Sequence, residues 1–437
     1  NKDNKVDYHD MWSILYGRPV YSATMSRRKF KEITKLLRFD DKSTREDRKA
    51  NDKFAALREL IENVNNKFPQ FYSPGFNVTI DEMLSLFRGK CPFKVFIKDK
   101  PGKYGILIRI LWYAETRYIL KMEVYAGKKE NEPRTERGPM ALVTRLVEPI
   151  KRSGRNVTTD RYYTSVDLAE TLWNDFHLTL VGTLQTNRKH IPEELKNTES
   201  RPLHSSMFAF TDSDSNNPVT LVSYIVKEKP KRNLIMLSTQ HMGEDVSDDE
   251  KHKPEIVLFY NSTKGGVDTV DQMARNYTVK RVTRRWPLSI FFTIIDIVCI
   301  NVYTLFILNF PQWKINHPNR RLQFLRQLSL DLIKPQIEER AKNLTGLNRT
   351  VISAMEDVLG RKLESAPQII AIPPTLVKRG IRCYCCIQEA TRKKIKCDKL
   401  GKSKVICVKC QKHVCGKHSN KTVICLKCEA ENDTSSD

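Results

Sequence analysis

The chain has 437 residues, 40% of them hydrophobic, and carries a formal net charge of +24 at pH 7. This apolar content is enough for at least one sizeable core and excludes wholesale disorder. The excess of Lys and Arg favours nucleic acid as the partner, although such a charge can also serve a membrane surface or simply keep a protein soluble.

The N-terminal region begins at Asn1 with neither Met nor a signal-peptide pattern, so we expect the chain to be part of a longer protein. Residues 1–70 show helical apolar spacing in "FKEITKLLRF" and "FAALRELIENV". The β-branched stretch "FNVTIDEMLSLF" then predicts a strand that carries Asp81. A hairpin of two more strands, turning near residues 115–117, is predicted in "YGILIRILWYAETRYILKMEVYAG".

The following segments alternate between helical and strand patterns. "MALVTRLVEPI" is helical, "NVTTD" is a strand ending at Asp160, "VDLAETLWNDF" is helical, and "LTLVGTL" is a buried strand. This order predicts a compact α/β core. From residue 187 to 254 the pattern weakens into polar sequence that includes the acidic "GEDVSDDE", and we interpret this part as an insertion.

Four aspartates lie at positions where a charged carboxylate requires a compensating positive charge. Asp268 and Asp271 lie three apart in "KGGVDTVDQM", after a β-like "EIVLFY", and on a helix they would share one face and repel. Asp81 and Asp160 lie at or near the ends of apolar strands, where desolvation of an unpaired acid is costly. Taken singly, each of these acids can be stabilised by a helix dipole or by a neighbouring arginine. Together they suggest a cluster for a hard cation such as Mg²⁺.

Residues Leu288–Phe310 form a 23-residue apolar run, long enough to cross a membrane. Asp296 and Asn301 interrupt the run and prolines flank it, so we interpret it as a buried core helix. Helical pattern continues to about Leu363, and "ESAPQIIAIPPTLVKRG" then has the composition of a linker.

Nine of the eleven cysteines lie between Cys383 and Cys428, which excludes a typical secreted disulfide framework. Seven of them form, with one histidine, four pairs with two-residue spacers: Cys383 and Cys386, Cys407 and Cys410, Cys415 and His418, Cys425 and Cys428. Each pair can reach one tetrahedral Zn²⁺, so the four pairs supply two sites. Spacing alone leaves open whether alternating pairs combine, as in a cross-brace, or successive ones.

Residues 383–428 carry 12 Lys and Arg against two acids. A small, basic domain held together by metal ions favours DNA binding, although the lysines can also serve only to keep this domain soluble. A RING-type ubiquitin ligase and a PHD-type histone reader are alternatives, but neither explains the upstream acids. The segment "TRKKIK" within this module can also serve nuclear import.

The chain resembles piggyBac-type transposases from roughly Tyr21 to Cys428. The likeness rests on five segments in the same order and at similar spacing: "TIDEMLSLFRGKCPFKVFIKDKPGKYGI", "LTLVGTLQTNRKHIPEEL", "RPLHSSMFAF", "YNSTKGGVDTVDQM" and "RRWPLSIFFTIIDIVCIN". The resemblance implies an α/β ribonuclease-H-like catalytic core with an insertion domain, a split helical DNA-binding and dimerisation domain, and a C-terminal cross-brace zinc domain.

We therefore expect the following boundaries: residues 1–76 and 278–363 for the split helical domain, 77–186 and 255–277 for the catalytic core, 187–254 for the insertion, 364–382 for a linker, 383–428 for the zinc domain, and 429–437 for an acidic tail.

The resemblance implies a catalytic set of Asp81, Asp160 and Asp268, which bind two Mg²⁺ or Mn²⁺ ions, with Asp271 close by. The glycine pair before Asp268 is expected to let the backbone turn sharply into the helix. One departure follows the second acid, where Arg161-Tyr162-Tyr163 replaces the family's Asn-Trp-Phe.

The cross-brace that the resemblance supports places Cys383, Cys386, Cys415 and His418 on one Zn²⁺, and Cys407, Cys410, Cys425 and Cys428 on the other. It leaves Cys385, Cys397 and His413 as non-ligands. Basic residues near the acids are candidate phosphate contacts, or alternatively solvent-facing charges: Arg88, Lys90, Lys280, Arg281, Arg284 and Arg285.

The implied function is cut-and-paste transposition in the nucleus. It consists of nicking at transposon ends, hairpin formation and opening, and joining of 3′ hydroxyls at TTAA targets by two-metal chemistry. The implied partners are double-stranded DNA, as terminal repeats and target, and at least one further copy of the chain, with no membrane. A domesticated DNA-binding protein without catalysis, and a chromatin or ubiquitin adaptor, are the alternatives.

Overall fold

The computed structural model describes residues 6–98, 100, 102–127, 138–212, 216–265, 267–363, 380–393, 402–407, 410 and 412–419, with the backbone alone for 267–269. It divides into two compact units. The first comprises Asn1–Gly17 and Ser26–Leu332, and the second comprises Arg18–Met25 and Ile333–Asp437.

The first unit begins with helices, as the apolar spacing of residues 1–70 predicts. Local signals start two of them, because the side chain of Asp7 accepts a hydrogen bond from the His9 N–H at 2.7 Å and that of Ser26 accepts one from the Lys29 N–H at 3.2 Å. These helices are α1 (Tyr8–Met11), α3 (Arg27–Leu36), α4 (Arg45–Asn51), the 3-10 turn η2 (Ala55–Leu57) and α5 (Arg58–Phe71).

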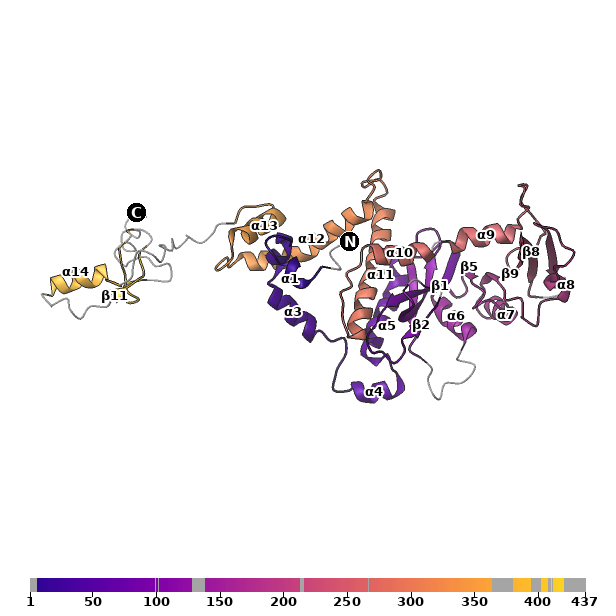
Figure 1. Ribbon diagram of the computed structural model, residues 1–437, viewed down its shortest axis with the longest axis horizontal. Coiled ribbons are helices and arrows are strands. Elements are labelled where there is room, and N and C mark those ends of the chain that lie inside the picture. Colours follow the sequence, from indigo (N-terminus) through magenta and orange to yellow (C-terminus); the bar gives the residue numbers. More distant parts are fainter. Residues whose placement is uncertain are drawn as a thin grey trace. The chain divides into compact units, whose positions relative to one another are not determined.

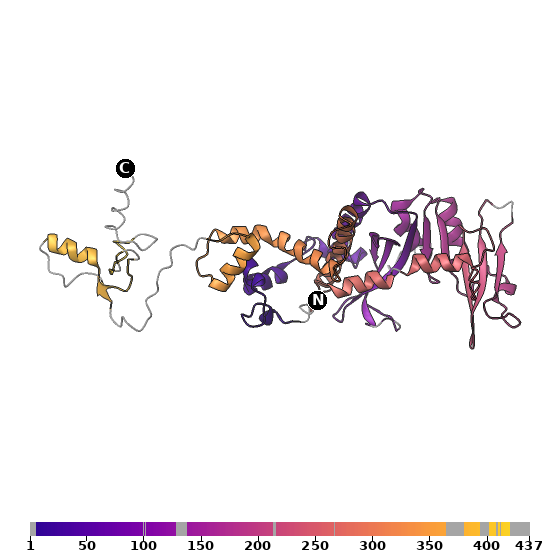
Figure 2. The same cartoon turned by 90° about the horizontal axis from the view of Figure 1, so that it is seen from above.

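A nine-stranded mixed sheet forms the centre of this unit (Figures 1 and 2). Its strands are β1 (Asn77–Leu86), β2 (Val95–Phe96), β3 (Tyr104–Tyr113), β4 (Ile119–Val124), β5 (Asn156–Thr159), β6 (Thr179–Thr183), β7 (Ser206–Phe210), β8 (Thr220–Glu228) and β9 (Lys231–Ser238). The predicted strand around Asp81, the hairpin after it, and the strands at "NVTT" and "LTLVGT" are confirmed.

The sheet order is β2-β3-β1-β5-β6-β9-β8-β7, and β4 also pairs with β3. Strands β1, β5 and β6 run parallel, and the other pairings are antiparallel. Since β9 pairs with β6, the strands of the expected insertion continue this sheet. Helices along the intervening segments are α6 (Pro139–Val147), the 3-10 turn η4 (Glu148–Ile150), α7 (Val166–Asn174) and α8 (Glu193–Lys196).

Helices α9 (Glu255–Lys264) and α10 (Val267–Asn276) follow one another across the sheet (Figure 2). Helix α9 packs against β9, β6, β5 and β1, and α10 packs against β1. The β-like interpretation of "EIVLFY" is therefore wrong. Its buried residues Ile256, Val257, Tyr260 and Thr263 follow helical spacing, and so short an apolar run does not distinguish a strand from a buried helix.

Helix α11 (Trp286–Asn309) is the apolar run, and among the described residues it is the one helix long and apolar enough to cross a membrane. Its isoleucines 290, 294, 297 and 300 lie in the main core, as expected of a core helix. The polar residues inside it have partners. Asp296 accepts hydrogen bonds from Thr278 Oγ1 and the Val279 N–H, and the Asn301 side chain bonds both the N–H and the carbonyl of Ile119 at 2.8 Å.

In the second unit, α2 (Pro19–Thr24), the end of α12 (Arg320–Ala341) and α13 (Arg349–Leu359) share a small core around Ala23, Ile337 and Met355. The described cysteine-rich residues form β10 (Ile381–Arg382), paired antiparallel with β11 (Lys402–Ser403), and α14 (Tyr384–Arg392). Residues 364–379 of the expected linker and the acidic tail lie outside the described residues.

Candidate catalytic and metal-binding sites

The register between β1 and β5 brings two of the predicted acids onto neighbouring strands. Thr79 pairs with Thr158 across this parallel ladder. Asp81 lies two residues beyond Thr79, and Asp160 lies two residues beyond Thr158, directly after the last residue of β5. Because alternate residues of a strand share a face and adjacent strands lie about 4.8 Å apart, the register places these acids side by side.

A buried threonine cluster fixes α9 over the same two strands. Thr79 Oγ1 donates to the Thr263 carbonyl at 2.9 Å, and Thr158 Oγ1 donates to Thr263 Oγ1 at 2.9 Å. All three threonines are at most 3% exposed. These bonds connect β1 and β5 to α9, the helix that precedes α10. They lie two residues before Asp81 on β1 and two residues before Asp160 at the end of β5.

Asp81 lies in an environment that disfavours its charge. Its pKa is raised to about 6, chiefly by burial and also by the negative charge of Asp160. The Glu82 backbone N–H, which donates to Asp81 Oδ1 at 2.5 Å, and the ammonium groups of Lys100 and Lys264 act in the opposite direction. Lys100 and Lys264 are thus cations that favour the charged form of Asp81.

Lys264 is a functional candidate that sequence reasoning missed. It ends α9, one residue after Thr263, and its Nζ lies 5.2 Å from the centre of the Tyr260 ring. Burial by itself lowers the pKa of Lys264, but Tyr260, Asp160 and Asp81 outweigh burial and the pKa lies above its usual value. A lysine held beside two acids is a resident positive charge at the site.

Asp160 organises the turn that follows β5. Its Oδ1 accepts the Tyr162 N–H at 3.0 Å, and its carbonyl accepts Thr164 Oγ1 at 2.8 Å. The Tyr163 ring is buried, and its hydroxyl lies 3.4 Å from Glu82 Oε2, next to Asp81. Arg161, the first residue that departs from the family pattern, is exposed.

The third acid, Asp268, lies in the first turn of α10, the helix that packs against β1. Its side chain is outside the described part of the chain. Asp271, one turn later, forms an i,i+4 ion pair with Arg275 at 2.5 Å. Gly265 has φ −61°, a right-handed conformation open to any residue, so the expected role of the glycine pair does not apply to Gly265.

Three of the six predicted phosphate contacts make bonds inside the protein. Lys280 Nζ donates to Ser85 Oγ at 2.9 Å and to the Leu86 carbonyl at 2.7 Å, and burial lowers the pKa of Lys280 to about 8. Arg281 donates to the carbonyl of Val6. Arg285 donates to the carbonyls of Thr34, Lys35 and Leu37 at the end of α3. These residues hold the segment before α11 in place.

The other three, Arg88, Lys90 and Arg284, are exposed. Gly89 brings them together, since a Cβ at this glycine would lie 3.0 Å from the Arg284 carbonyl. The loop after β1 therefore abuts the segment before α11, so the backbones that carry these three exposed cations lie close together.

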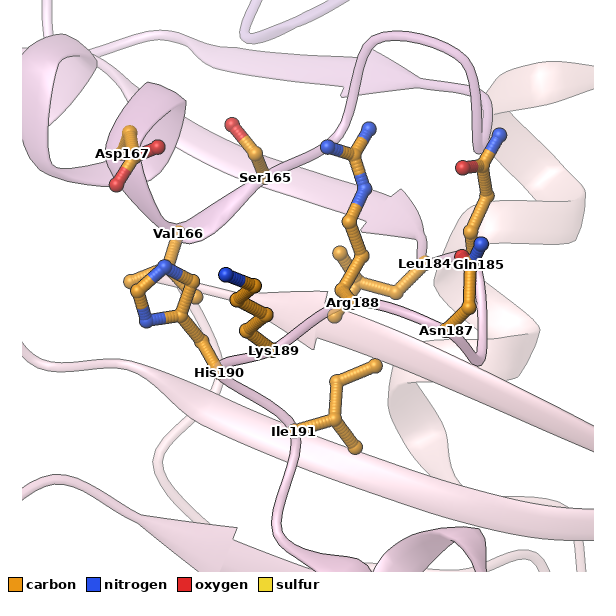
Figure 3. Close-up of a pocket in the computed structure, with 10 residues that line it drawn as sticks. All are labelled: Ser165, Val166, Asp167, Leu184, Gln185, Asn187, Arg188, Lys189, His190 and Ile191. Carbon is orange, nitrogen blue, oxygen red and sulfur yellow. The ribbon is translucent and has the colours of Figure 1, made fainter.

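A cavity of about 400 Å³ lies between the start of α7 and the segment after β6 (Figure 3). Since β5 and β6 are parallel, it opens at the edge of the sheet where Asp160 stands. Arg188 Nε is buried there without a hydrogen-bond partner in the described part of the chain. Sequence reasoning missed this cavity, whose lining is Ser165, Val166, Asp167, Leu184, Gln185, Asn187, Arg188, Lys189, His190 and Ile191.

The ligand atoms of Cys383, Cys386, Cys415 and His418 all lie within 4.8 Å of one another. Zinc bonds of about 2.3 Å to sulfur and 2.0–2.1 Å to nitrogen place tetrahedral ligands about 3.8 Å apart for two sulfurs and about 3.5 Å for sulfur and nitrogen. The Sγ atoms of Cys386 and Cys415 are 3.7 Å apart, and His418 Nδ1 lies 3.3–3.6 Å from the three Sγ atoms. This geometry fits Zn²⁺.

The group combines the first and third Cys/His pairs, as a cross-brace requires. Cys407 is buried and Cys410 is half-buried. The remaining members of the expected second site, Cys425 and Cys428, lie outside the described residues, as does Cys397. His413 Nδ1 lies 3.0 Å from the carbonyl of Ser403.

Comparison with known proteins identifies similar chains. Residues 3–303 match the model of the family described as Transposase IS4. Human piggyBac transposable element-derived protein 3 is 23% identical over 317 residues, which cover 69% of this chain and 50% of that protein. Human piggyBac transposable element-derived protein 2 is 25% identical over 301 residues, covering 64% and 48%. The chain thus spans about half the length of the curated relatives it matches.

Among solved structures, the cryo-EM structure of the piggyBac transposase synaptic complex with hairpin DNA matches with a TM-score of 0.73 and 32% identity. The match covers 98% of this chain and 84% of that chain.

Proposed function

The chain belongs to the Transposase IS4 family, among its piggyBac-type members, and from this membership we propose that it is a cut-and-paste DNA transposase. It nicks transposon ends, forms and opens end hairpins, and joins 3′ hydroxyls at TTAA targets. The observation that carries this proposal is the register of the parallel strands β1 and β5, which places Asp81 of β1 beside Asp160, the residue directly after β5. Asp268 lies on α10, which packs against β1.

Asp81, Asp160 and Asp268 would hold two Mg²⁺ or Mn²⁺ ions. Carboxylate oxygens suit these hard cations, and a dication would offset the repulsion that raises the pKa of Asp81. Such ions supply an activated water and charge stabilisation at phosphorus. The chain's own contribution is to hold the acids in register through the threonine cluster, with Lys264 beside them.

The proposed domain layout follows the predicted boundaries, with a ribonuclease-H-like core on the mixed sheet. The parallel strands β1, β5 and β6 flanked by the antiparallel β3 and β4 support this assignment. Zinc held by Cys383, Cys386, Cys415 and His418 would staple the C-terminal module, and a second ion would be held by Cys407, Cys410, Cys425 and Cys428.

Double-stranded DNA is the proposed partner, contacted by the exposed surface of Arg88, Lys90 and Arg284 and by the basic zinc module. The net charge of +24 and the DNA-bound state of the structural relative support this partner. That relative is a synaptic complex, which supports a dimer or larger assembly of this chain. A DNA substrate implies action in the nucleus.

The test incubates the protein, expressed from its complete reading frame, with TTAA-flanked end DNA and Mg²⁺. We expect metal-dependent nicks and hairpins from the unmodified protein and none from Asp268→Ala or Asp81→Asn. The matched control is Glu170→Gln, which changes an exposed acid of α7 outside the cavity lining and should leave cleavage intact. Cleavage that persists in Asp268→Ala and Asp81→Asn would refute the assignment.

A domesticated DNA-binding protein without catalysis is the second candidate. It is favoured by the curated relatives, which are named as derived from transposable elements. If the chain is such a DNA-binding protein, it should bind end DNA equally well with and without Asp81, Asp160 and Asp268. It should produce no nicks in Mg²⁺ or Mn²⁺.

A further inference from the structure

The two ring nitrogens of His418 face different partners. Nδ1 faces the three cysteine sulfurs at 3.3–3.6 Å, while Nε2 lies 3.1 Å from Glu389 Oε1. Glu389 is on α14, three residues after Cys386, and residues at this spacing share one face of a helix. One helix therefore presents both a metal-binding sulfur and a carboxylate to the same histidine.

This arrangement matters because a histidine can bind a metal only through a nitrogen that carries no proton. A neutral imidazole has one proton, and the hydrogen bond of one nitrogen sets which nitrogen is free. A carboxylate beside Nε2 keeps the proton there, which leaves the lone pair of Nδ1 directed at the sulfurs. Such partners also fix the orientation of the ring.

We propose that Glu389 is a positioning residue of the zinc site, which accepts a hydrogen bond from the Nε2–H of His418 and holds Nδ1 toward the metal. This inference rests on the proposed zinc cofactor. The Glu389 side chain is 59% exposed and that of His418 is 13% exposed. A contact with so exposed an acid adds little to folding by itself, so the effect of Glu389 should appear in metal affinity.

The test measures zinc affinity of the whole 437-residue chain by competition with a chromophoric chelator. Glu389→Ala should weaken the binding of one zinc ion about 10–100-fold. Glu389→Gln retains an oxygen acceptor without the charge, so its affinity should lie between those of the Ala variant and the unmodified chain. Gln388→Ala is the matched control, since the neighbouring Gln388 side chain bonds the Tyr384 hydroxyl instead, and it should leave affinity unchanged.

The results separate the possible failures. Equal zinc affinity in Glu389→Ala, Glu389→Gln and the unmodified chain would overturn the role of Glu389 and leave the zinc site standing. An equal loss in Gln388→Ala and Glu389→Ala would also overturn it, because the loss would then belong to the helix as a whole. Absence of zinc from the unmodified chain would refute the cofactor itself.

Discussion

Asp81 is a residue whose ionisation should be visible in the stability of the protein. Its pKa is about 6 in the fold against 3.8 for the ordinary side chain, so its stabilising contribution is complete below pH 3.8 and is lost as the pH rises through 6. At pH 7.5 the charged group therefore costs folding energy. We expect Asp81→Asn to raise the metal-free unfolding free energy by about 1–3 kcal/mol at pH 7.5.

At pH 4.5 Asp81→Asn should raise the unfolding free energy by less than half as much, because the Asp81 carboxyl is then mostly protonated in the native state. Urea unfolding at both pH values, with Glu170→Gln as the control for an exposed acid, measures the difference. With Mg²⁺ present the order should reverse, since only the unmodified chain gains from the metal. An equal gain at both pH values would contradict the burial of a charged Asp81.

Lys280 and Arg284 lie close in sequence but should respond oppositely to substitution. Lys280→Met removes two internal hydrogen bonds, leaves Leu86 without its ammonium donor, and should cost about 1–3 kcal/mol of unfolding free energy. Arg284→Ala changes an exposed side chain and should alter stability by less than about 0.5 kcal/mol.

DNA binding should show the converse. Arg284→Ala should reduce the slope of log affinity against log salt by about 1, because one phosphate contact is lost. Lys280→Met should leave this slope unchanged. Anisotropy titrations of end DNA at several salt concentrations measure both slopes, and a reduced slope for Lys280→Met would show that its ammonium reaches phosphate.

At the scale of elements, the threonine cluster should couple α9 to the sheet energetically. Val replaces Thr with nearly the same shape but no hydroxyl. We expect Thr158→Val and Thr263→Val each to destabilise the fold, and the double variant to lose less than the sum, with a coupling of about 0.5–3 kcal/mol. Urea unfolding of the four chains measures it. Thr171→Val with Thr263→Val is the control pair, since the Thr171 hydroxyl bonds the Asp167 carbonyl within its own helix, α7. Additivity in both pairs would contradict the coupling.

How far the sequence predicts these elements depends on how local their causes are. The strands around Asp81 and Asp160 and the cysteine pairs are predictable, because alternation and ligand spacing act over a few residues. The threonine cluster joins residues 184 and 105 positions apart, and Lys280 bonds a serine 195 positions away. No local pattern encodes such contacts. The prediction of a strand at α9 fails because its apolar run is too short to show its period.

At the scale of the whole molecule, the two kinds of metal site that we propose use ligands of opposite character. Thiolates and imidazole select zinc, whereas carboxylates select Mg²⁺. A soft chelator with nitrogen donors, used in excess Mg²⁺, should therefore empty the zinc module and leave the aspartate site loaded. We expect such treatment to weaken binding of end DNA and to reduce its salt slope, because the basic module loses its fold.

The Mg²⁺-induced rise in melting temperature should survive the same treatment, since it depends on Asp81 and its neighbours in the other unit. Re-addition of zinc should restore DNA binding, and Cys415→Ser should reproduce the chelated state without any chelator. Loss of the Mg²⁺ response together with DNA binding would mean that the cysteine-rich module and the aspartate site do not act as separate metal centres. DNA binding that persists after chelation would mean that the charge of the module is not what attracts DNA.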